Sequence, residues 1–323
     1  MEFLKIDESD SYQSNILNRE LIRTGSSNDG SCFFYSIFYP FQFFRKLSVP
    51  ERSEYIGNKR REIAERIDLN GWFSLQNGNI AFLQITQALN KIIHSIPRVL
   101  YENHDYLTQN NLDLLSLEIL FTLLNPTTIE KEILPTWDIK CSQINENQAE
   151  SMLGIIKKEW CKLYEQKIRE KINNIEKNLN KNIDKMTDQK KEAVIQKLAN
   201  ISNIIFDFVA NYALDEFKTE IRDPTRWINI FILHGVIINI DLKMNIIFID
   251  SETGSLYEGM KLYYKKEMFS NDNPFVLLLY FKQMHFECLG RKYIQNNKMY
   301  INRLFKKDDP IVMTCLSYLD ADY

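Results

Sequence analysis

The sequence is poor in cysteine and histidine. Its 323 residues include five cysteines and four histidines. The cysteines are odd in number and lack Cys-x-x-Cys spacing, which argues against a disulfide framework and against a zinc site. This usage is typical of a protein in a reducing compartment, and we expect no bound metal.

Excess charge and long apolar runs are also scarce. The formal net charge is −3, so no overall basic field recruits nucleic acid. The most apolar run, residues 112–124, is too short to span a bilayer and contains Asp113 and Glu118. The first residues lack a basic stretch followed by an apolar one. The sequence therefore predicts a soluble protein with neither a secretory signal nor a membrane span.

One cysteine follows a turn that leads into an apolar, helix-like run. Asp29-Gly30-Ser31-Cys32 is followed directly by Phe33-Phe34-Tyr35. At a helix N-terminus the sulfur would meet unpaired N–H groups and the positive end of the helix dipole, which favour the nucleophilic thiolate. Taken alone, the pattern also fits a buried structural cysteine. The functional interpretation therefore depends on a suitable histidine elsewhere.

Three histidines have a sufficient structural explanation. They are His94 in an apolar helical run, His104 in a polar loop and His234 at an expected helix end. His285 differs because it begins a short strand after the apolar run 275–281, and Glu287 shares its strand face at a period of two. A carboxylate there can orient the imidazole and stabilise its protonated form. The alternative is a surface strand with alternating polar residues.

The two motifs together resemble those of the ovarian tumour (OTU) superfamily of cysteine proteases, most of which are deubiquitinases. In that family Asp-Gly-x-Cys and two apolar or aromatic residues begin a helix near the N-terminus. Late in the chain an aliphatic strand and a short turn precede His-Tyr/Phe-x-x-Leu/Val. This chain has Asp29 to Phe34 and then 275–289, and the resemblance covers about 20–60 and 220–290. The Trp227 segment, which runs into 236–240, resembles the family's tryptophan-led helix before its central strands.

The chain departs from the family at two places. Trp227 lacks the glycines that follow the tryptophan in the family. The third catalytic residue, commonly Asp or Asn, is Glu287 here. The resemblance implies Cys32 as nucleophile, His285 as base and Glu287 as the orienting acid, with Asn28 or Asp29 as alternatives for the acid.

The resemblance also implies an activity and a partner. The reaction is hydrolysis of isopeptide bonds at the ubiquitin C-terminus, without a cofactor. Backbone N–H groups of Asp29, Gly30, Ser31 and Cys32 would face the oxyanion, and Asp29 would shape the loop by accepting backbone hydrogen bonds. Ubiquitin or polyubiquitin is the expected partner, and the host cytoplasm is the expected location for a bacterial effector or viral protein. A papain-like or viral protease of peptide bonds, an inactive ubiquitin-binding scaffold and a coiled-coil adaptor stay open.

The order of elements indicates the fold class. Helices come first and strands follow, which predicts an α+β protein. After a polar lead-in at 1–28, helices are expected from Cys32 to about Tyr39 and at 51–69, 80–96 and 112–124. Strands are expected at 236–240, 245–249, 275–281, 285–289 and 299–301.

The stretch 143–219 differs from its surroundings because apolar residues recur at helical spacing, which predicts a helical hairpin whose second helix is capped at Thr187-Asp188. We therefore divide the chain into 1–142, an N-terminal part with the nucleophile, 143–219, an inserted hairpin, and 220–323, a β-rich part with His285. The hairpin is either a ubiquitin-binding arm or a part with a structural role, as a stabilising extension or a self-association surface. The resemblance implies a papain-related core of helices on a small central sheet.

Overall fold

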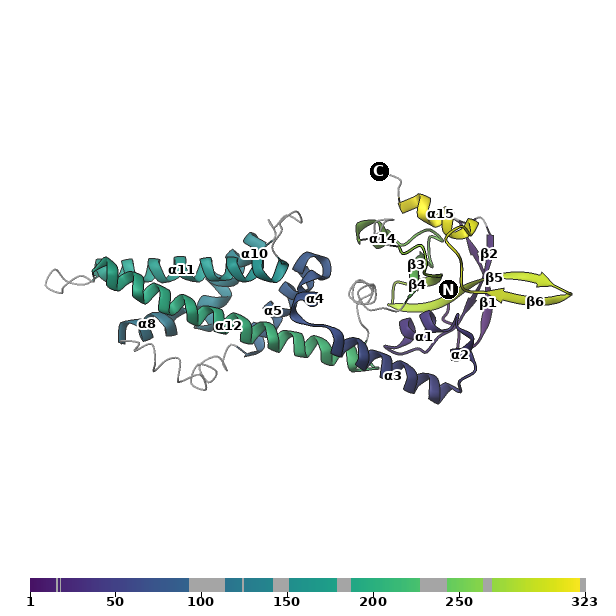
Figure 1. Ribbon diagram of the computed structural model, residues 1–323, viewed down its shortest axis with the longest axis horizontal. Coiled ribbons are helices and arrows are strands. Elements are labelled where there is room, and N and C mark those ends of the chain that lie inside the picture. Colours follow the sequence, from purple (N-terminus) through teal and green to yellow (C-terminus); the bar gives the residue numbers. More distant parts are fainter. Residues whose placement is uncertain are drawn as a thin grey trace. The chain divides into compact units, whose positions relative to one another are not determined.

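A computed structural model describes residues 1–15, 17, 19–92, 114–123, 125–141, 151–178, 187–226, 243–263 and 269–319. The chain forms two compact units, each considered separately below (Figure 1). The first, called the sheet unit, comprises Met1–Ile67 and Lys218–Tyr323. The second, called the helical unit, comprises Asp68–Phe217. Helices and a mixed sheet occur in one chain, which confirms the predicted α+β class.

The sheet unit is built on a mixed sheet with the strand order β1-β2-β5-β4-β3, and β6 pairs with the outer part of β5. The pair β3–β4 is parallel and the other described pairs are antiparallel. Its strands are β1 (Ser9–Ser14), β2 (Arg19–Thr24), β3 (Asn245–Asp250), β4 (Phe275–Phe281), β5 (His285–Gln295) and β6 (Lys298–Asn302). Its helices are α1 (Cys32–Phe38), α2 (Gln42–Arg45), α3 (Val49–Arg66), α14 (Glu258–Tyr263) and α15 (Pro310–Leu319).

Strand β4 lies between β3 and β5 and is buried along its whole length. A continuous apolar run is what a strand covered on both faces requires. Strand β5 is buried over its first six residues and emerges into solvent beyond Gly290. There it forms a hairpin with β6 that projects beyond the other strands of the sheet (Figure 1). The two-residue connection has positive φ at Asn296 and Asn297, as the preferred hairpin turns require.

Helix α1 packs against the sheet through its aromatic side chains. Phe33 contacts Phe286 of β5 edge-on, with ring centroids 5.3 Å apart, and lies 6.3 Å from Phe248 of β3. The helix ends at Phe38, just before Pro40, as predicted. The strands predicted at 245–249, 275–281, 285–289 and 299–301 correspond to β3, β4, β5 and β6.

The helical unit contains two long helices that lie side by side, α11 (Met152–Asn178) and α12 (Asp188–Arg222), of which the last residues, from Lys218, belong to the sheet unit (Figure 1). Trp160 of α11 donates its indole N–H to the carbonyl of Ser202 in α12. Thr187 caps α12, because its hydroxyl accepts the amide of Lys190 at 3.3 Å. The other elements are α4 (Leu69–Ser74), η1 (Leu75–Gly78), α5 (Asn79–Ile92), α8 (Leu114–Leu123), α9 (Pro126–Thr128), η3 (Ile129–Ile133) and α10 (Leu134–Cys141).

The helical unit begins at Asp68, whereas the sequence-based division began the insertion at 143. Asp68 caps α4 by accepting the amide of Gly71 at 2.7 Å. Trp72 and Phe73 of α4 then pack against Phe217 and Phe206 of α12, with ring centroids 6.1 and 6.3 Å apart. Residues well before 143 therefore share one core with the two long helices.

One further difference concerns the start of the chain. The supposed lead-in 1–28 contains β1 and β2, whose Tyr12 and Leu21 are buried. The strand expected at 236–240 and the Trp227 segment lie outside the described residues, as do His94, His104 and His234.

Among the described residues one helix, α12, has the length and composition of a membrane span, and half of its apolar window is buried within the protein. This is weak evidence for a span, because a core helix of a soluble protein meets the same criterion.

Candidate active site

The turn before α1 is built around Asp29. Its carboxylate accepts the amide of Ser31 at 2.9 Å, and its carbonyl accepts the amide of Cys32 at 3.2 Å. Gly30 has no room for a side chain, since a Cβ atom would lie 2.3 Å from the carbonyl oxygen of Arg226. The turn therefore delivers Cys32 as the first residue of α1. The amides of Ser31 and Cys32 that the resemblance assigns to the oxyanion are bonded within the turn.

A buried arginine from α3 holds this turn in place. The guanidinium of Arg60 donates to the carbonyls of Gly30 at 2.7 Å and of Ile221 at 2.6 Å, and further bonds reach the carbonyls of Asp223 and Arg226. The side chain is fully buried and stacks over Phe34. Burial lowers the pKa of Arg60 to about 10, so the group stays charged at neutral pH.

Cys32 lies against the start of β5. Its Sγ is 3.6 Å from the carbonyl oxygen of Met284, and the backbone amide of Phe286 lies close enough to lower the pKa of the thiol. These two residues flank His285, so the fold brings the predicted nucleophile and base together at the level of the main chain. The two lie more than 250 positions apart in the chain.

The charge state of Cys32 differs from the sequence-based expectation. A helix N-terminus was expected to favour the thiolate, but burial raises the pKa of the Cys32 thiol to about 12. The Phe286 amide lowers this pKa and the negative charge of Asp29 raises it, both by less than burial does. The side chain is only 1% exposed, and desolvation outweighs the dipole of a seven-residue helix.

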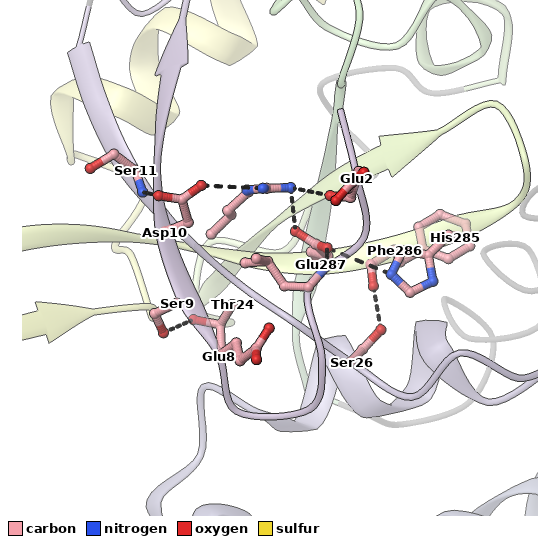
Figure 2. A network of polar contacts seen from close by, with 12 residues as sticks. Glu2, Glu8, Ser9, Asp10, Ser11, Thr24, Ser26, His285, Phe286 and Glu287 are labelled. Atoms are coloured by element: carbon pink, nitrogen blue, oxygen red, sulfur yellow. Dashed lines mark hydrogen bonds and ion pairs between the residues drawn. The ribbon is translucent and has the colours of Figure 1, made fainter.

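His285 and Glu287 share one face of β5, as the period of two predicted, and both are completely buried. Nε2 of His285 lies 3.7 Å from Oε1 of Glu287 (Figure 2). Phe286 between them points to the opposite face, against Phe33. The carbonyl of Phe286 accepts hydroxyl hydrogen bonds from Ser26 at 2.6 Å and Ser36 at 2.9 Å, which fix this part of the strand.

Glu287 is held by two hydrogen-bond donors, neither of them the histidine. The backbone amide of Leu4 donates to Oε1 at 2.8 Å, and Nη1 of Arg23 lies 3.4 Å from Oε2. A buried carboxylate needs such partners to remain ionised. These two contacts fix the position of the Glu287 carboxyl group beside the imidazole.

The imidazole of His285 is placed mainly by aromatic contacts. Phe3 stacks on it with ring centroids 4.1 Å apart and an interplanar angle of 27°, and Phe281 lies 5.6 Å away. Among the described residues neither ring nitrogen has a hydrogen-bond partner. The thiol of Cys32 bonds to Met284 instead of to the imidazole. With Nε2 facing Glu287, Nδ1 is the nitrogen left to take a proton from a thiol.

Neither alternative third residue forms a hydrogen bond with the imidazole of His285. Asn28 and Asp29 are exposed, and the Asp29 carboxylate caps its own turn. In the described part of the chain, Glu287 is therefore the candidate acid that lies beside His285. No group of three or more His, Cys, Asp or Glu side chains there is placed to hold a metal ion.

Sequence reasoning missed Arg60, Arg23 and the first residues of the chain. Arg60 lies four residues after Ile56 and three before Ile63, both buried, so helical spacing alone could have placed it on the inner face of α3. Arg23 and the segment around Phe3 gave no such signal, because their partners come from β5 at the other end of the chain.

Comparison of the chain with protein-family models, with curated proteins and with solved structures found no match.

Proposed function

We propose that this chain is a cysteine hydrolase of the OTU type, which cleaves isopeptide bonds at the C-terminus of ubiquitin. The observation that carries the proposal is the position of the Cys32 sulfur, in contact with the main chain on both sides of His285. The Asp29 turn and the pairing of His285 with Glu287 support it further. The residues of both motifs are those that suggested the family from the sequence.

In the proposed reaction, His285 takes the proton of Cys32 through Nδ1, and the thiol exchanges its bond to Met284 for one to the imidazole. The thiolate attacks the carbonyl carbon of the isopeptide bond, and negative charge develops on the carbonyl oxygen. The imidazolium then protonates the leaving lysine amine, and water attacks the thioester to release ubiquitin and regenerate the thiol. Glu287 stabilises the imidazolium and holds the ring in one tautomer.

The turn acts in the step in which the thiolate attacks and the carbonyl oxygen becomes an oxyanion. We propose that the backbone amides of the Asp29–Cys32 turn bind it, which requires that the amides of Ser31 and Cys32 turn from Asp29 toward the substrate or share their hydrogens. Losing one such donor typically costs about 100- to 1,000-fold in turnover. Arg60 keeps the turn in register by binding the Gly30 carbonyl.

The partner in this proposal is ubiquitin or a polyubiquitin chain, met in a reducing compartment such as the host cytoplasm, where Cys32 stays a thiol. The helical unit is the second proposed contact for ubiquitin. It exposes large apolar side chains, among them Leu83 and Phe121, each more than half exposed. A loss of chain cleavage in Phe121→Asp, with unchanged cleavage of a single-ubiquitin substrate, would support that role.

The substrate class is tested by comparing three substrates of the full chain: a fluorogenic amide of ubiquitin, a panel of linked ubiquitin chains, and an unstructured peptide with the ubiquitin C-terminal sequence. We expect turnover of the first two and little of the peptide, with Cys32→Ala inert on all. Efficient cleavage of the peptide would favour the protease of peptide bonds. Binding of ubiquitin without turnover would indicate the inactive scaffold.

A further inference from the structure

The first residues of the chain contact both members of the buried pair on β5. Residues 2–8, called the N-terminal segment, run past β2 at close range. A Cβ atom on Gly25 would lie 2.2 Å from the carbonyl oxygen of Lys5 and 2.6 Å from that of Leu4. The amide of Gly25 donates to the carbonyl of Glu8 at 2.9 Å. The missing side chain at position 25 therefore makes room for the segment.

Charged groups anchor the segment at both ends. Asp7 accepts a hydrogen bond from Arg52 of α3 at 2.7 Å, and the arginine is buried. At the other end, Nη1 of Arg23 donates to the carbonyl of Glu2 at 2.9 Å and lies 3.4 Å from Glu287 Oε2 (Figure 2). One guanidinium nitrogen thus links the segment to the carboxylate.

Between these anchors, two consecutive residues meet the site. Phe3 stacks on the imidazole of His285, and its ring also meets Phe281 edge-on at 5.0 Å. Leu4 donates its amide hydrogen to Oε1 of Glu287, the oxygen that faces Nε2 of His285. The segment therefore restricts the rotation of the ring with an aromatic face and fixes the carboxylate with a main-chain donor.

We infer that the N-terminal segment is a positioning element of the active site, in which Phe3 orients the His285 ring and the Leu4 amide orients Glu287. The inference rests on the proposed function for its catalytic consequence, but the contacts themselves can be tested without turnover. Reaction rates are sensitive to orientation, and a displacement of about 1 Å can cost on the order of 100-fold. The segment also excludes water from the His285–Glu287 pair, which strengthens their interaction.

The aromatic contact is tested with Phe3→Ala and the conservative variant Phe3→Tyr, with Phe43→Ala, an exposed ring of α2, as matched control. Modification of each histidine by diethyl pyrocarbonate is read from peptide masses, and kcat and KM are measured with the fluorogenic ubiquitin amide. We expect His285 to be protected in the wild type, in Phe3→Tyr and in Phe43→Ala, and modified in Phe3→Ala. We expect kcat to fall on the order of 100-fold in Phe3→Ala with KM little changed, and to recover in Phe3→Tyr.

The main-chain contact is tested with Leu4→Pro, which removes the donating hydrogen, against Leu4→Ala, which keeps it. Because the proline variant loses a hydrogen bond to a carboxyl group, we expect its kcat to fall by roughly 10- to 100-fold. We expect little loss for the alanine variant. Equal activity of the two variants would overturn the role of the Leu4 amide.

Two results for Phe3→Ala would overturn the inference. One is protection of His285 as complete as in the wild type. The other is a rate equal to or above that of the wild type, which would make the segment a cap over the site. If the wild type hydrolyses no ubiquitin conjugate, the proposed function fails, whereas the histidine modification pattern still decides whether the segment holds the ring.

Discussion

The two units differ in what they bury. In the sheet unit the described buried side chains include charged or titratable groups: Arg23, Arg52, Arg60, His285, Glu287 and Arg303. In the helical unit the described buried polar side chains are Ser116 and Ser202, and charged residues such as Arg169 pair at the surface. A buried charge costs free energy unless it is fully hydrogen-bonded. The sheet unit is therefore organised around the exact placement of polar groups, and the helical unit around apolar packing.

The largest effect that we expect from a substitution in the sheet unit is the fall in kcat when Glu287 is replaced. Glu287→Gln keeps an acceptor for the Leu4 amide but removes the charge that stabilises the imidazolium and faces Arg23. By analogy with the acid of a serine-protease triad, we expect kcat to fall by roughly 100- to 10,000-fold. Turnover of the fluorogenic ubiquitin amide measures this, with circular dichroism to confirm folding. Glu252→Gln, an exposed carboxylate of the same unit, is the control, and equal activity of the two variants would place the orienting acid elsewhere.

The next largest effect is expected on the free energy of unfolding, when Arg60 is replaced. Arg60→Met removes five main-chain hydrogen bonds and leaves the carbonyls of Gly30 and Ile221 buried without this donor. Each lost partner leaves a penalty of about 1–3 kcal/mol, so we expect the free energy of unfolding to fall by about 3 kcal/mol or more. Denaturant unfolding measures it. Arg61→Met, at the exposed next position of α3, should change stability by less than about 0.5 kcal/mol; a similar small change for Arg60 would contradict its anchoring role.

Because Cys32 is protonated at neutral pH, its reactivity with an alkylating reagent should depend on pH. Because its pKa is raised to about 12, the thiol is protonated at neutral pH and its thiolate fraction grows with every unit of pH. We therefore expect the rate of Cys32 alkylation by iodoacetamide in the free protein to rise about tenfold per unit between pH 7 and 9. Peptide masses follow this rate at Cys32 separately from the other cysteines. A rate that is already level at pH 7 would mean that the thiolate–imidazolium pair exists before substrate binds.

The smallest effect is expected on the free energy of unfolding when Arg169, an exposed residue of the helical unit, is replaced. Arg169 pairs with Glu165 and Glu192 at 2.9 Å, and all three side chains are about half exposed. Exposed ion pairs contribute about 0.2–1 kcal/mol, so Arg169→Gln should lower the free energy of unfolding by about 1 kcal/mol or less. The pair is also screened by salt, and the difference from wild type should shrink in concentrated salt. A loss as large as that of Arg60→Met would remove the distinction between the units.

The local parts of this fold could be read from the sequence, and the parts made by distant contacts could not. The apolar run 275–281, the cap at Thr187 and the end of α1 before Pro40 depend on neighbouring residues, and the structure has them as predicted. Strands β1 and β2 were missed because their apolar residues are few and their partner β5 lies at the other end of the chain.

The same distinction holds within the candidate site. The shared face of His285 and Glu287 follows from strand geometry and was predicted. The protonation of Cys32 was not, because burial depends on what the whole unit packs around the sulfur. Phe3 and Leu4 were invisible as site residues for the same reason, since nothing in residues 1–8 points to contacts with residues 285 and 287.

The most direct test of the account is covalent capture of ubiquitin that carries a C-terminal electrophile, followed by mapping of the modified cysteine. We predict that the wild type is captured at Cys32, that Cys32→Ala and His285→Ala are not captured, and that Cys288→Ala retains most of the reaction. Unchanged capture by Cys32→Ala, or modification of another cysteine in the wild type, would contradict the assignment of Cys32 and His285 as the reacting pair.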